Sequence, residues 1–335
     1  MSEYGANWWH VIDDGRIQCD LCPRECKLQE GQQGLCFVRA RRGGKMVLDT
    51  WGRSSGFCID PIEKKPLNHF YPGTSVLSFG TAGCNLFCKF CQNWDISKSR
   101  DIDKLSQQAS PQQLAQACLD RQVPAVAFTY NDPVIFAEYA LDIADSCHEL
   151  GIRTVAVTAG YIHAAPRRSL FAKMDAANVD LKAFTPSFYE NLCGGNLRHV
   201  LDTLLYIRHQ TRCWLEITTL LIPNANDSPA EIKALSQWIY RELGADVPLH
   251  FTAFHPDFKL TDRPATPPET VQLARTLALE QGLRYVYTGN IHDPAGGTTH
   301  CPHCQHILIV RDWHQITHYA LKEGNRCTAC GYAIA

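Results

Sequence analysis

The 335-residue sequence has no stretch that approaches the ~20 consecutive apolar residues of a membrane-spanning helix. Its first nine residues also lack a basic segment followed by an apolar core, which is the pattern of a secretory signal. The charge is nearly balanced, with 32 lysine and arginine residues against 34 aspartate and glutamate residues. We therefore expect a cytoplasmic protein with no membrane partner, and a general attraction to nucleic acid is not indicated.

Cysteine, in contrast, is abundant. Sixteen cysteines in a chain of this length, without a secretory signal, indicate thiolates that hold metals in a reducing compartment rather than disulfides. Eleven of them form three groups: Cys19, Cys22, Cys26 and Cys36; Cys84, Cys88 and Cys91; and Cys301, Cys304, Cys327 and Cys330. The other five are expected to be mostly small buried apolar residues: Cys58, Cys118, Cys147, Cys193 and Cys213.

The middle group organises the chain. Cys84, Cys88 and Cys91 are spaced C-x3-C-x2-C, directly after a β-branched and apolar run. Four cysteines would satisfy every iron of a cubane cluster, whereas three thiolates leave one iron free to bind a ligand that is not protein. Zinc is the alternative for cysteines so close in sequence. We favour the open cluster, because the three-residue gap is unusual for a zinc knuckle and the motif follows a strand.

The two outer groups predict separate metal sites. The four N-terminal cysteines form a closed set that suits tetrahedral zinc, which we favour because nothing brings a substrate there; a second iron–sulfur cluster fits the same ligands. At the C-terminus, two C-x2-C knuckles about twenty residues apart flank a β-like segment. This is a zinc-ribbon pattern, in which a structural zinc folds a tail too small for a core of its own.

The region between these groups alternates strands and helices. Ser110, Ser228 and Thr266 each precede proline and are predicted to cap helices, and Gly151, Gly244 and Gly282 lie where helices should end. Parallel βα units at this spacing predict an α/β fold, an open partial (β/α)6–7 barrel, with active groups at the C-terminal ends of its strands. The predicted strands are Ser75–Gly80, Ala125–Tyr130, Arg153–Thr158, Asn178–Phe184, Trp214–Ile222, Leu249–Phe254 and Arg284–Tyr287.

The chain is accordingly divided into three predicted parts: a cysteine-rich head and loop region over residues 1–74, the barrel over 75–295, and a zinc-ribbon-like tail over 296–335. Within the first part, the stretch 62–73 is rich in proline, histidine, lysine and aromatic residues. It is either a packed loop that covers one end of the barrel or a wall of the active site.

The C-x3-C-x2-C spacing, with Phe90 before its last cysteine, resembles the motif of the radical S-adenosylmethionine (SAM) superfamily. Over nearly its full length the chain resembles the radical SAM enzymes of the AmmeMemoRadiSam group, which are related to the pyruvate formate-lyase activating enzymes. The resemblance rests on the head, the cysteine motif, and four further segments: 63–73, Thr129–Pro133, Asp180–Lys182 and Thr288–Asp293.

This resemblance implies that a [4Fe–4S] cluster binds SAM and cleaves it reductively to a 5′-deoxyadenosyl radical, which abstracts hydrogen from a substrate. It implies an oxidoreductase of activase-like type, an electron donor of flavodoxin or ferredoxin type, and partners such as a protein substrate or AMMECR1/Memo-like proteins. The residues implied to bind the cofactor are Phe90, Asn131, Asp132, Asp180, Lys182, Thr218 (with Thr219 beside it) and His255.

Each of these positions also has a structural interpretation. Asp132 before Pro133 is an ordinary helix N-cap, and Asp180 with Lys182 forms an ion pair on one side of a strand. His255 beside proline suits a structural role. Two functions of other kinds remain as alternatives: radical SAM modification of RNA or a small metabolite, and an iron–sulfur electron carrier without enzymatic activity. No residue is assigned to the radical step itself.

Overall fold

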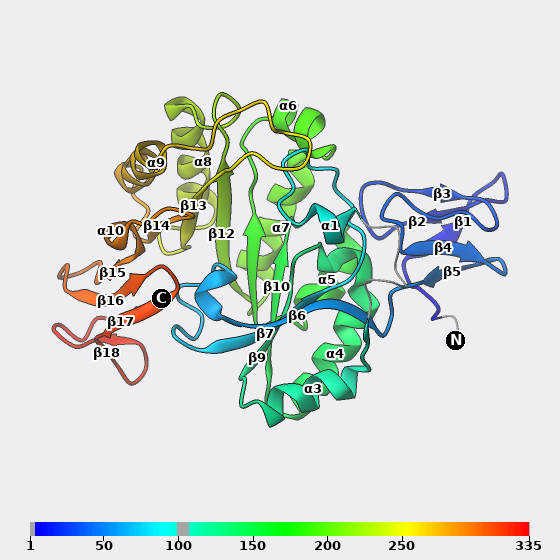
Figure 1. Cartoon of the computed structure of the whole chain (residues 1–335), viewed down its shortest axis with the longest axis horizontal. Coiled ribbons are helices and arrows are strands. Elements are labelled where there is room, and N and C mark those ends of the chain that lie inside the picture. Colours follow the sequence, from blue (N-terminus) through cyan, green and yellow to red (C-terminus); the bar gives the residue numbers. More distant parts are fainter. Residues whose placement is uncertain (1–3, 99–106, 335) are drawn as a thin grey trace.

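A nine-stranded sheet forms the centre of the computed structural model, which describes residues 4–98 and 107–334 (Figure 1). Its order is β14-β13-β12-β11-β10-β9-β7-β6-β8, and the seven strands from β14 to β7 are parallel. These seven are β7 (Ser75–Gly80), β9 (Ala125–Phe128), β10 (Arg153–Thr158), β11 (Ala176–Asp180), β12 (Trp214–Leu221), β13 (Leu249–Ala253) and β14 (Val286–Gly289). Strands β6 (Arg53–Pro61) and β8 (Gln107–Gln108) extend the sheet in antiparallel fashion. Over the described residues the sheet does not close, which confirms the predicted partial barrel.

Helices connect the parallel strands and pack around the outside of the sheet (Figure 1). The longer ones are α3 (Pro111–Asp120), α4 (Ala137–Glu149), α5 (Ala164–Phe171), α7 (Leu197–Gln210), α8 (Pro229–Glu242) and α9 (Pro268–Glu280). The shorter ones are α1 (Trp94–Ser97), α6 (Pro186–Phe188) and α10 (Pro294–Gly297), with single turns at Ile62–Lys64, Pro133–Phe136 and Tyr189–Cys193. No helix within the described residues is both long and apolar enough to span a membrane.

Two of the three predicted helix caps are confirmed. The side chain of Ser110 accepts a hydrogen bond from the amide of Gln113, and that of Ser228 from the amide of Glu231. The prediction for Thr266 is wrong, because α9 begins one residue later than expected, with Pro267 at the N-cap. The hydroxyl of Thr266 instead joins two strand ends, accepting from the amide of Phe254 and donating to the carbonyl of Leu221.

The segment 62–73, called here the barrel plug, fills the N-terminal end of the barrel. Its apolar side chains, Ile62 and Leu67, pack against inward-facing residues near the starts of the strands, including Ala125, Val155 and Ala176. Glu216, near the start of β12, accepts hydrogen bonds from the amides of Asn68 (2.9 Å) and His69 (2.8 Å). This segment is therefore a packed loop that closes one end of the barrel. The cysteine loop follows β7 at the opposite, C-terminal end.

The head and the tail flank the barrel on opposite sides (Figure 1). The head contains β1 (Trp9–Val11), β2 (Ile17–Cys19), β3 (Lys27–Leu28), β4 (Arg39–Arg42) and β5 (Lys45–Leu48). It is docked by a buried ion pair of 2.8 Å between Arg39 and Glu138 of α4.

The tail contains β15 (Thr299–His300), β16 (Ile307–Asp312), β17 (Gln315–Tyr319), β18 (Leu321–Lys322) and β19 (Arg326–Cys327). Its buried Arg311 donates a hydrogen bond of 2.6 Å to the carbonyl of Asn68 in the barrel plug.

Candidate metal centre and cofactor site

The loop with Cys84, Cys88 and Cys91 begins at the C-terminal end of β7, where the parallel-barrel rule places active groups. Cys88 is buried, and Cys84 and Cys91 are half-buried. Gly80 lets the chain pass close to the next strand, because a side chain there would lie 2.6 Å from the carbonyl of Thr129. The loop is therefore packed directly on the end of β9.

Asn131 holds the start of this loop. Its carbonyl oxygen accepts from the amide of Thr81 (3.1 Å), and its amide group donates to the hydroxyl of Thr81 (3.0 Å) and the carbonyl of Gly83 (2.9 Å). Asn131 was predicted to bind cofactor, and the structure places its side chain against Gly83, the residue before Cys84. Its buried side-chain hydrogen bonds show that it fixes the path of the backbone into the cysteine motif.

The middle of the loop pairs with the segment after β11. The amide of Phe87 donates to the carbonyl of Cys193 (2.8 Å), and the amide of Lys89 donates to the carbonyl of Leu192 (2.9 Å). These two bonds bracket Cys88, and the buried Cys193 thiol lies within hydrogen-bonding reach of the Cys88 thiol. Cys193 is one of the five scattered cysteines of the sequence, and no spacing there connects it with the central motif.

The end of the loop is held by α1 and by the segment after β13. The thiol of Cys91 lies 3.1 Å from the hydroxyl of Ser97. The exposed His255 contacts Gln92 (3.0 Å), and the indole of Trp94 donates to Asp257 (3.0 Å). The structure therefore places His255 over the outer side of the cysteine loop, where the side chain is 59 % exposed.

Asp132 caps the turn that follows β9, as its structural interpretation predicted. One carboxylate oxygen accepts from the amide of Val134 (3.0 Å) and the hydroxyl of Thr158 (2.8 Å), and the other accepts from the amide of Ala159 (2.9 Å). A carboxylate offers about four acceptor positions. Two of these bonds join the turn after β9 to the end of β10, and the third caps the turn itself. Among the described residues one acceptor position on the second oxygen is unused.

Asp180 and Lys182 lie together at the end of β11, joined by an ion pair of 3.0 Å. Burial alone would lower the pKa of Lys182, but Asp180 and the thiols of Cys88 and Cys193 raise it well above its usual value. The ammonium group is also 6.0 Å from the ring of Phe90, which is buried against Phe188. These contacts bring Phe90, Asp180 and Lys182 to the same side of the cysteine loop.

Thr218 continues this polar surface on the neighbouring strand. The register pairs Thr218 with Asp180 on one side and with His250 on the other. Its hydroxyl is buried without a hydrogen-bond partner among the described residues. Buried hydroxyls are normally satisfied, so this group has the hydrogen-bonding capacity that a polar ligand inside the barrel would use. Thr219 points the other way and donates to the carbonyl of Leu181 (2.7 Å).

These residues fit an open iron–sulfur cluster with a polar ligand beside it. The loop supplies three thiols, the usual ligands of such clusters, and Asn131 and the Cys193 segment hold its backbone from two sides. A cation at Lys182, a carboxylate at Asp180 and an unsatisfied hydroxyl at Thr218 lie along the adjoining strand ends.

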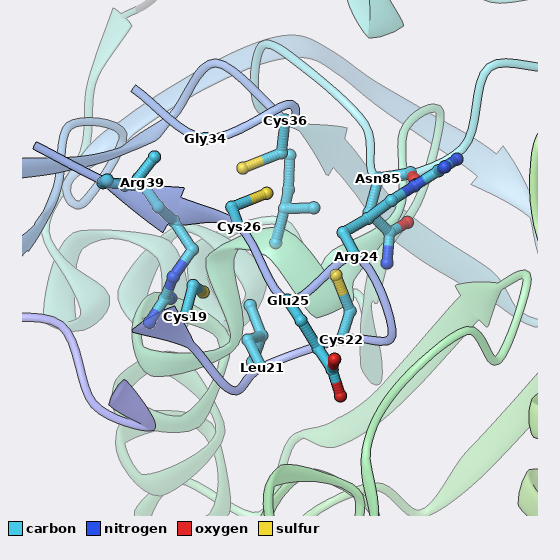
Figure 2. A pocket seen from close by; sticks show the side chains of 12 residues that line it. Cys19, Leu21, Cys22, Arg24, Glu25, Cys26, Gly34, Cys36, Arg39 and Asn85 are labelled. Atoms are coloured by element: carbon cyan, nitrogen blue, oxygen red, sulfur yellow. The ribbon is translucent and has the colours of Figure 1, made fainter. Parts of the chain in front are cut away.

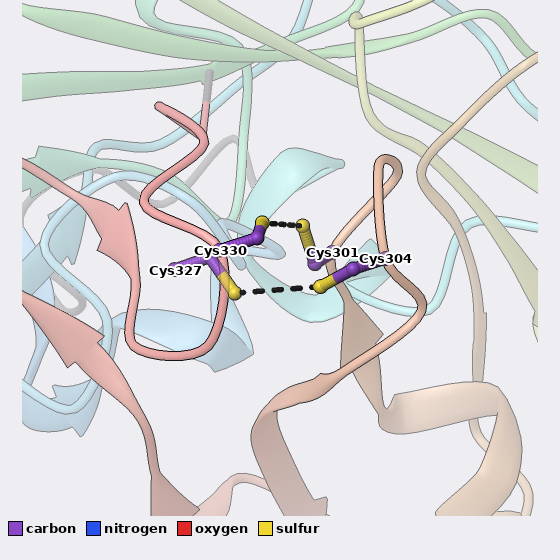
Figure 3. Close-up of side chains that lie close together, drawn as sticks. All are labelled: Cys301, Cys304, Cys327 and Cys330. Atoms are coloured by element: carbon purple, nitrogen blue, oxygen red, sulfur yellow. Dashed lines mark hydrogen bonds between the residues drawn. The ribbon is translucent and has the colours of Figure 1, made fainter.

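The C-terminal cysteines form a second candidate site (Figure 3). Their four sulfur atoms all lie within 4.8 Å of one another, with Cys301–Cys330 at 3.6 Å and Cys304–Cys327 at 3.8 Å. Tetrahedral zinc with Zn–S bonds of about 2.3 Å holds its sulfur ligands about 3.8 Å apart. The four thiols therefore have the spacing that a single tetrahedral metal ion such as zinc requires.

The N-terminal cysteines line a small pocket in the head (Figure 2). Cys26 and Cys36 point towards one another, with Cys19 and Cys22 on either side, and Arg39 lies beside Cys19. Asn85, the residue after Cys84, lines the same pocket. The predicted set is thus brought together, and it adjoins the first cysteine of the central motif, which no spacing in the sequence indicates.

Comparison with known proteins gives a consistent result. A model of the Radical SAM superfamily matches residues 79–235. The chain is 38% identical to the uncharacterized protein MJ0808 of Methanocaldococcus jannaschii over 330 residues, 98% of each chain. It is 25% identical to the pyruvate formate-lyase-activating enzyme of Clostridium pasteurianum over 178 residues, 50% of this chain and 70% of that one. Its fold resembles a radical SAM methyltransferase from Sphaerobacter thermophilus, with a TM-score of 0.54 and 13% identity over 86% of this chain and 78% of that one.

Proposed function

This chain belongs to the radical SAM superfamily, and from that membership we propose that it abstracts hydrogen from a polypeptide substrate, in the manner of an activating enzyme. A [4Fe–4S] cluster with SAM on its open iron supplies, when bound, the one-electron cleavage that yields methionine and a 5′-deoxyadenosyl radical. The observation that carries the proposal is the loop with Cys84, Cys88 and Cys91, which leaves β7 at the C-terminal end of the barrel.

In this proposal the three thiolates hold the cluster, and the adjoining strand ends hold SAM. The Lys182 ammonium is suited to the SAM carboxylate, and its ion pair with Asp180 keeps it directed to this end of β11. The free acceptor position on Asp132 is suited to the SAM ammonium. The Thr218 hydroxyl would donate to a polar group deeper in the barrel. Phe90 and His255 would line the site from the loop and from its outer rim.

The choice of a polypeptide is supported by the likeness to an activating enzyme, which covers half of this chain. The electron would come from a one-electron carrier of flavodoxin or ferredoxin type. AMMECR1/Memo-like proteins are proposed as partners or substrates on the sequence resemblance alone.

The test has two stages. Reconstituted protein reduced with dithionite should convert SAM to 5′-deoxyadenosine, and Cys88→Ala should abolish this conversion. The protein is then incubated with a deuterated cell extract separated by size into macromolecules and small metabolites. Deuterium in 5′-deoxyadenosine should come from the protease-sensitive macromolecular fraction. Deuterium only from the small-molecule fraction, or only from a ribonuclease-sensitive one, would instead identify a metabolite or RNA enzyme, and no cleavage of SAM at all would indicate an electron carrier.

A further inference from the structure

The pocket in the head differs from the zinc-type site in the tail, although each has four cysteines. Among the described residues, the tail cysteines form the one group of three or more His, Cys, Asp or Glu side chains whose ligand atoms all lie within 4.8 Å of one another. The head cysteines surround a pocket instead of closing on a point (Figure 2). The central motif, with Cys84, Cys88 and Cys91, also lacks the close spacing of the tail.

This difference discriminates between a single ion and a cluster. One tetrahedral zinc draws all four sulfur atoms to about 2.3 Å from a single point. In a cubane each cysteine binds a different iron, and inorganic sulfide fills the space between, so the thiolates are farther apart. A pocket between the four head thiols suits the larger group. Three of its walls are apolar side chains, Leu21, Leu28 and Ile135.

Arg39 adds an unused donor to this pocket. Its terminal nitrogens bind the Glu138 carboxylate (2.8 Å) and the carbonyl of Asn7 (2.6 Å), but its Nε is buried without a partner among the described residues. The guanidinium interacts electrostatically with the sulfurs of Cys19 and Cys36. The inorganic sulfide of a cluster would accept a hydrogen bond from this Nε, as the thiolates beside it would, so the donor suits a site rich in sulfur.

The head pocket also touches the central cysteine loop. The carbonyl of Cys36 packs on Gly83, so closely that a Cβ on that glycine would lie 2.1 Å from the oxygen. Gly83 has a φ of +87°, in the region that favours glycine, and directly precedes Cys84. Beside this contact the Nε of Arg24 donates to the carbonyl of Asn85 (2.8 Å). One backbone contact therefore separates a cysteine of the head from the first cysteine of the central motif.

We propose that Cys19, Cys22, Cys26 and Cys36 hold a fully ligated iron–sulfur cluster of the [4Fe–4S] class, which passes electrons to the central site through the Cys36–Gly83 contact. One electron from a reduced flavodoxin- or ferredoxin-type carrier enters the head cluster and then leaves it for the central cluster. The carrier is oxidised by one electron, the central site is reduced by one, and the head returns to its starting state. The relay rests on the proposed function, whereas the identity of the metal group does not.

The metal group is tested by counting iron, sulfide and zinc in the intact chain after anaerobic reconstitution. We expect about eight irons and eight sulfides with one zinc per chain. The triple variant C84A/C88A/C91A should keep about four irons, in a cluster whose spectrum SAM does not alter. Two zincs with four irons in the intact chain, or a triple variant that holds no iron, would overturn the proposal. Because this triple variant lacks the central site, its result is independent of whether the protein cleaves SAM.

The relay is tested by rapid-freeze electron paramagnetic resonance with reduced flavodoxin as the donor. In Cys36→Ala, reduction of the SAM-responsive cluster should be at least tenfold slower, while its final extent under dithionite is unchanged. An unchanged rate in a variant that has lost the head cluster would refute the relay. If Cys36→Ala does not fold, the fully reduced intact chain is measured instead by the same resonance method. We expect magnetic coupling between the two reduced clusters, and two uncoupled signals would refute the relay.

Discussion

The side-chain amide of Asn131 donates a hydrogen bond of 2.9 Å to the backbone carbonyl of Gly83, and so ties the end of β9 to the residue before Cys84. Asn131→Ala removes this bond and two others to Thr81. Because the loop groups left unpaired are buried, we expect unfolding free energy to fall by about 3 kcal/mol and iron uptake at the central site to fall with it. Denaturant unfolding and the amount of SAM-responsive cluster measure the two effects.

The matched control for Asn131 is Asn178→Ala. Asn178 is also buried, and it donates to the carbonyl of Pro66 in the plug (2.7 Å), away from the cysteine loop. It should lower stability without lowering the amount of SAM-responsive cluster. Equal loss of that cluster in both variants would mean that Asn131 acts only through general stability.

Cys193 provides a second prediction, because its thiol lies beside that of Cys88. Cys193→Ala should leave the iron content unchanged, since the three cysteines of the motif remain. Hydrogen bonds to ligand sulfur are among the factors that set cluster potentials. Loss of a donor to the Cys88 sulfur should disfavour the more negative, reduced state, so we expect a lower midpoint potential in a redox titration.

Cys147→Ala is the control for Cys193, because Cys147 is equally buried but lies on α4. Each variant should cost about 1 kcal/mol of stability. Two outcomes would contradict a role of Cys193 as a hydrogen-bond donor to Cys88. In one, the central cluster fails to form in Cys193→Ala; in the other, the midpoint potentials of Cys193→Ala and Cys147→Ala are equal.

The cysteine groups should separate by metal. Cys88→Ala is expected to remove the SAM-responsive iron while the zinc content is retained. Cys301→Ala or Cys327→Ala should remove the zinc and lower the melting temperature, because the tail has only a small core, formed by residues such as Leu308 and Ile309. Elemental analysis of each purified variant decides. Zinc lost with the first variant and iron with the others would reverse the assignment.

Arg311 joins the tail to the barrel. It is 2% exposed and donates to Asn68 (2.6 Å), Thr299 (2.8 Å) and Gly297 (3.1 Å). The single ammonium group of lysine cannot reproduce the planar set of donors of the guanidinium. Arg311→Lys should therefore lower the free energy of unfolding by about 3 kcal/mol. Arg326→Lys, at an exposed arginine of the tail, should change it by less than about 0.5 kcal/mol. Similar small changes in both variants would show that the anchor contributes little.

Glu216 predicts a pH dependence of stability. Burial alone would raise its pKa, but the hydrogen bond and charge of His250 (2.7 Å) outweigh this effect and lower the pKa to about 2. A carboxyl with a pKa below its unfolded value of 4.5 stabilises the fold above that pH, and the contribution is lost as pH falls from about 4.5 to 2. The size of this shift corresponds to about 3 kcal/mol.

The measurement is urea unfolding of wild type and Glu216→Gln at pH 6 and pH 3. Other acidic groups and the metal ligands titrate in both proteins, so the difference between them reports this carboxyl together with its partner His250. Wild type should lose more stability than the variant over this interval. Parallel losses would show that the carboxyl titrates alike in the folded and unfolded chain.

Local information in the sequence determined much of the fold. Most strand and helix positions followed from short apolar runs, capping residues and terminal glycines, because these signals act within a few residues along the chain. An exception is β11, which ends at Asp180 and not at the predicted Phe184. Ser110 and Ser228 cap their helices as predicted. Thr266 does not, because its hydroxyl donates to the carbonyl of Leu221, 45 residues earlier in the chain. The spacing of Cys84, Cys88 and Cys91 was likewise sufficient to predict the superfamily and its cofactors.

Only the tertiary structure decided how distant residues meet. The sequence by itself contained all four head cysteines, but nothing in their spacing places Cys36 on Gly83 or leaves a pocket between the thiols. Cys193 follows Cys88 by more than a hundred positions, and it reaches that cysteine because the end of β11 lies beside the loop that leaves β7. Such contacts depend on strand order and on packing between layers, which no local pattern in the sequence specifies.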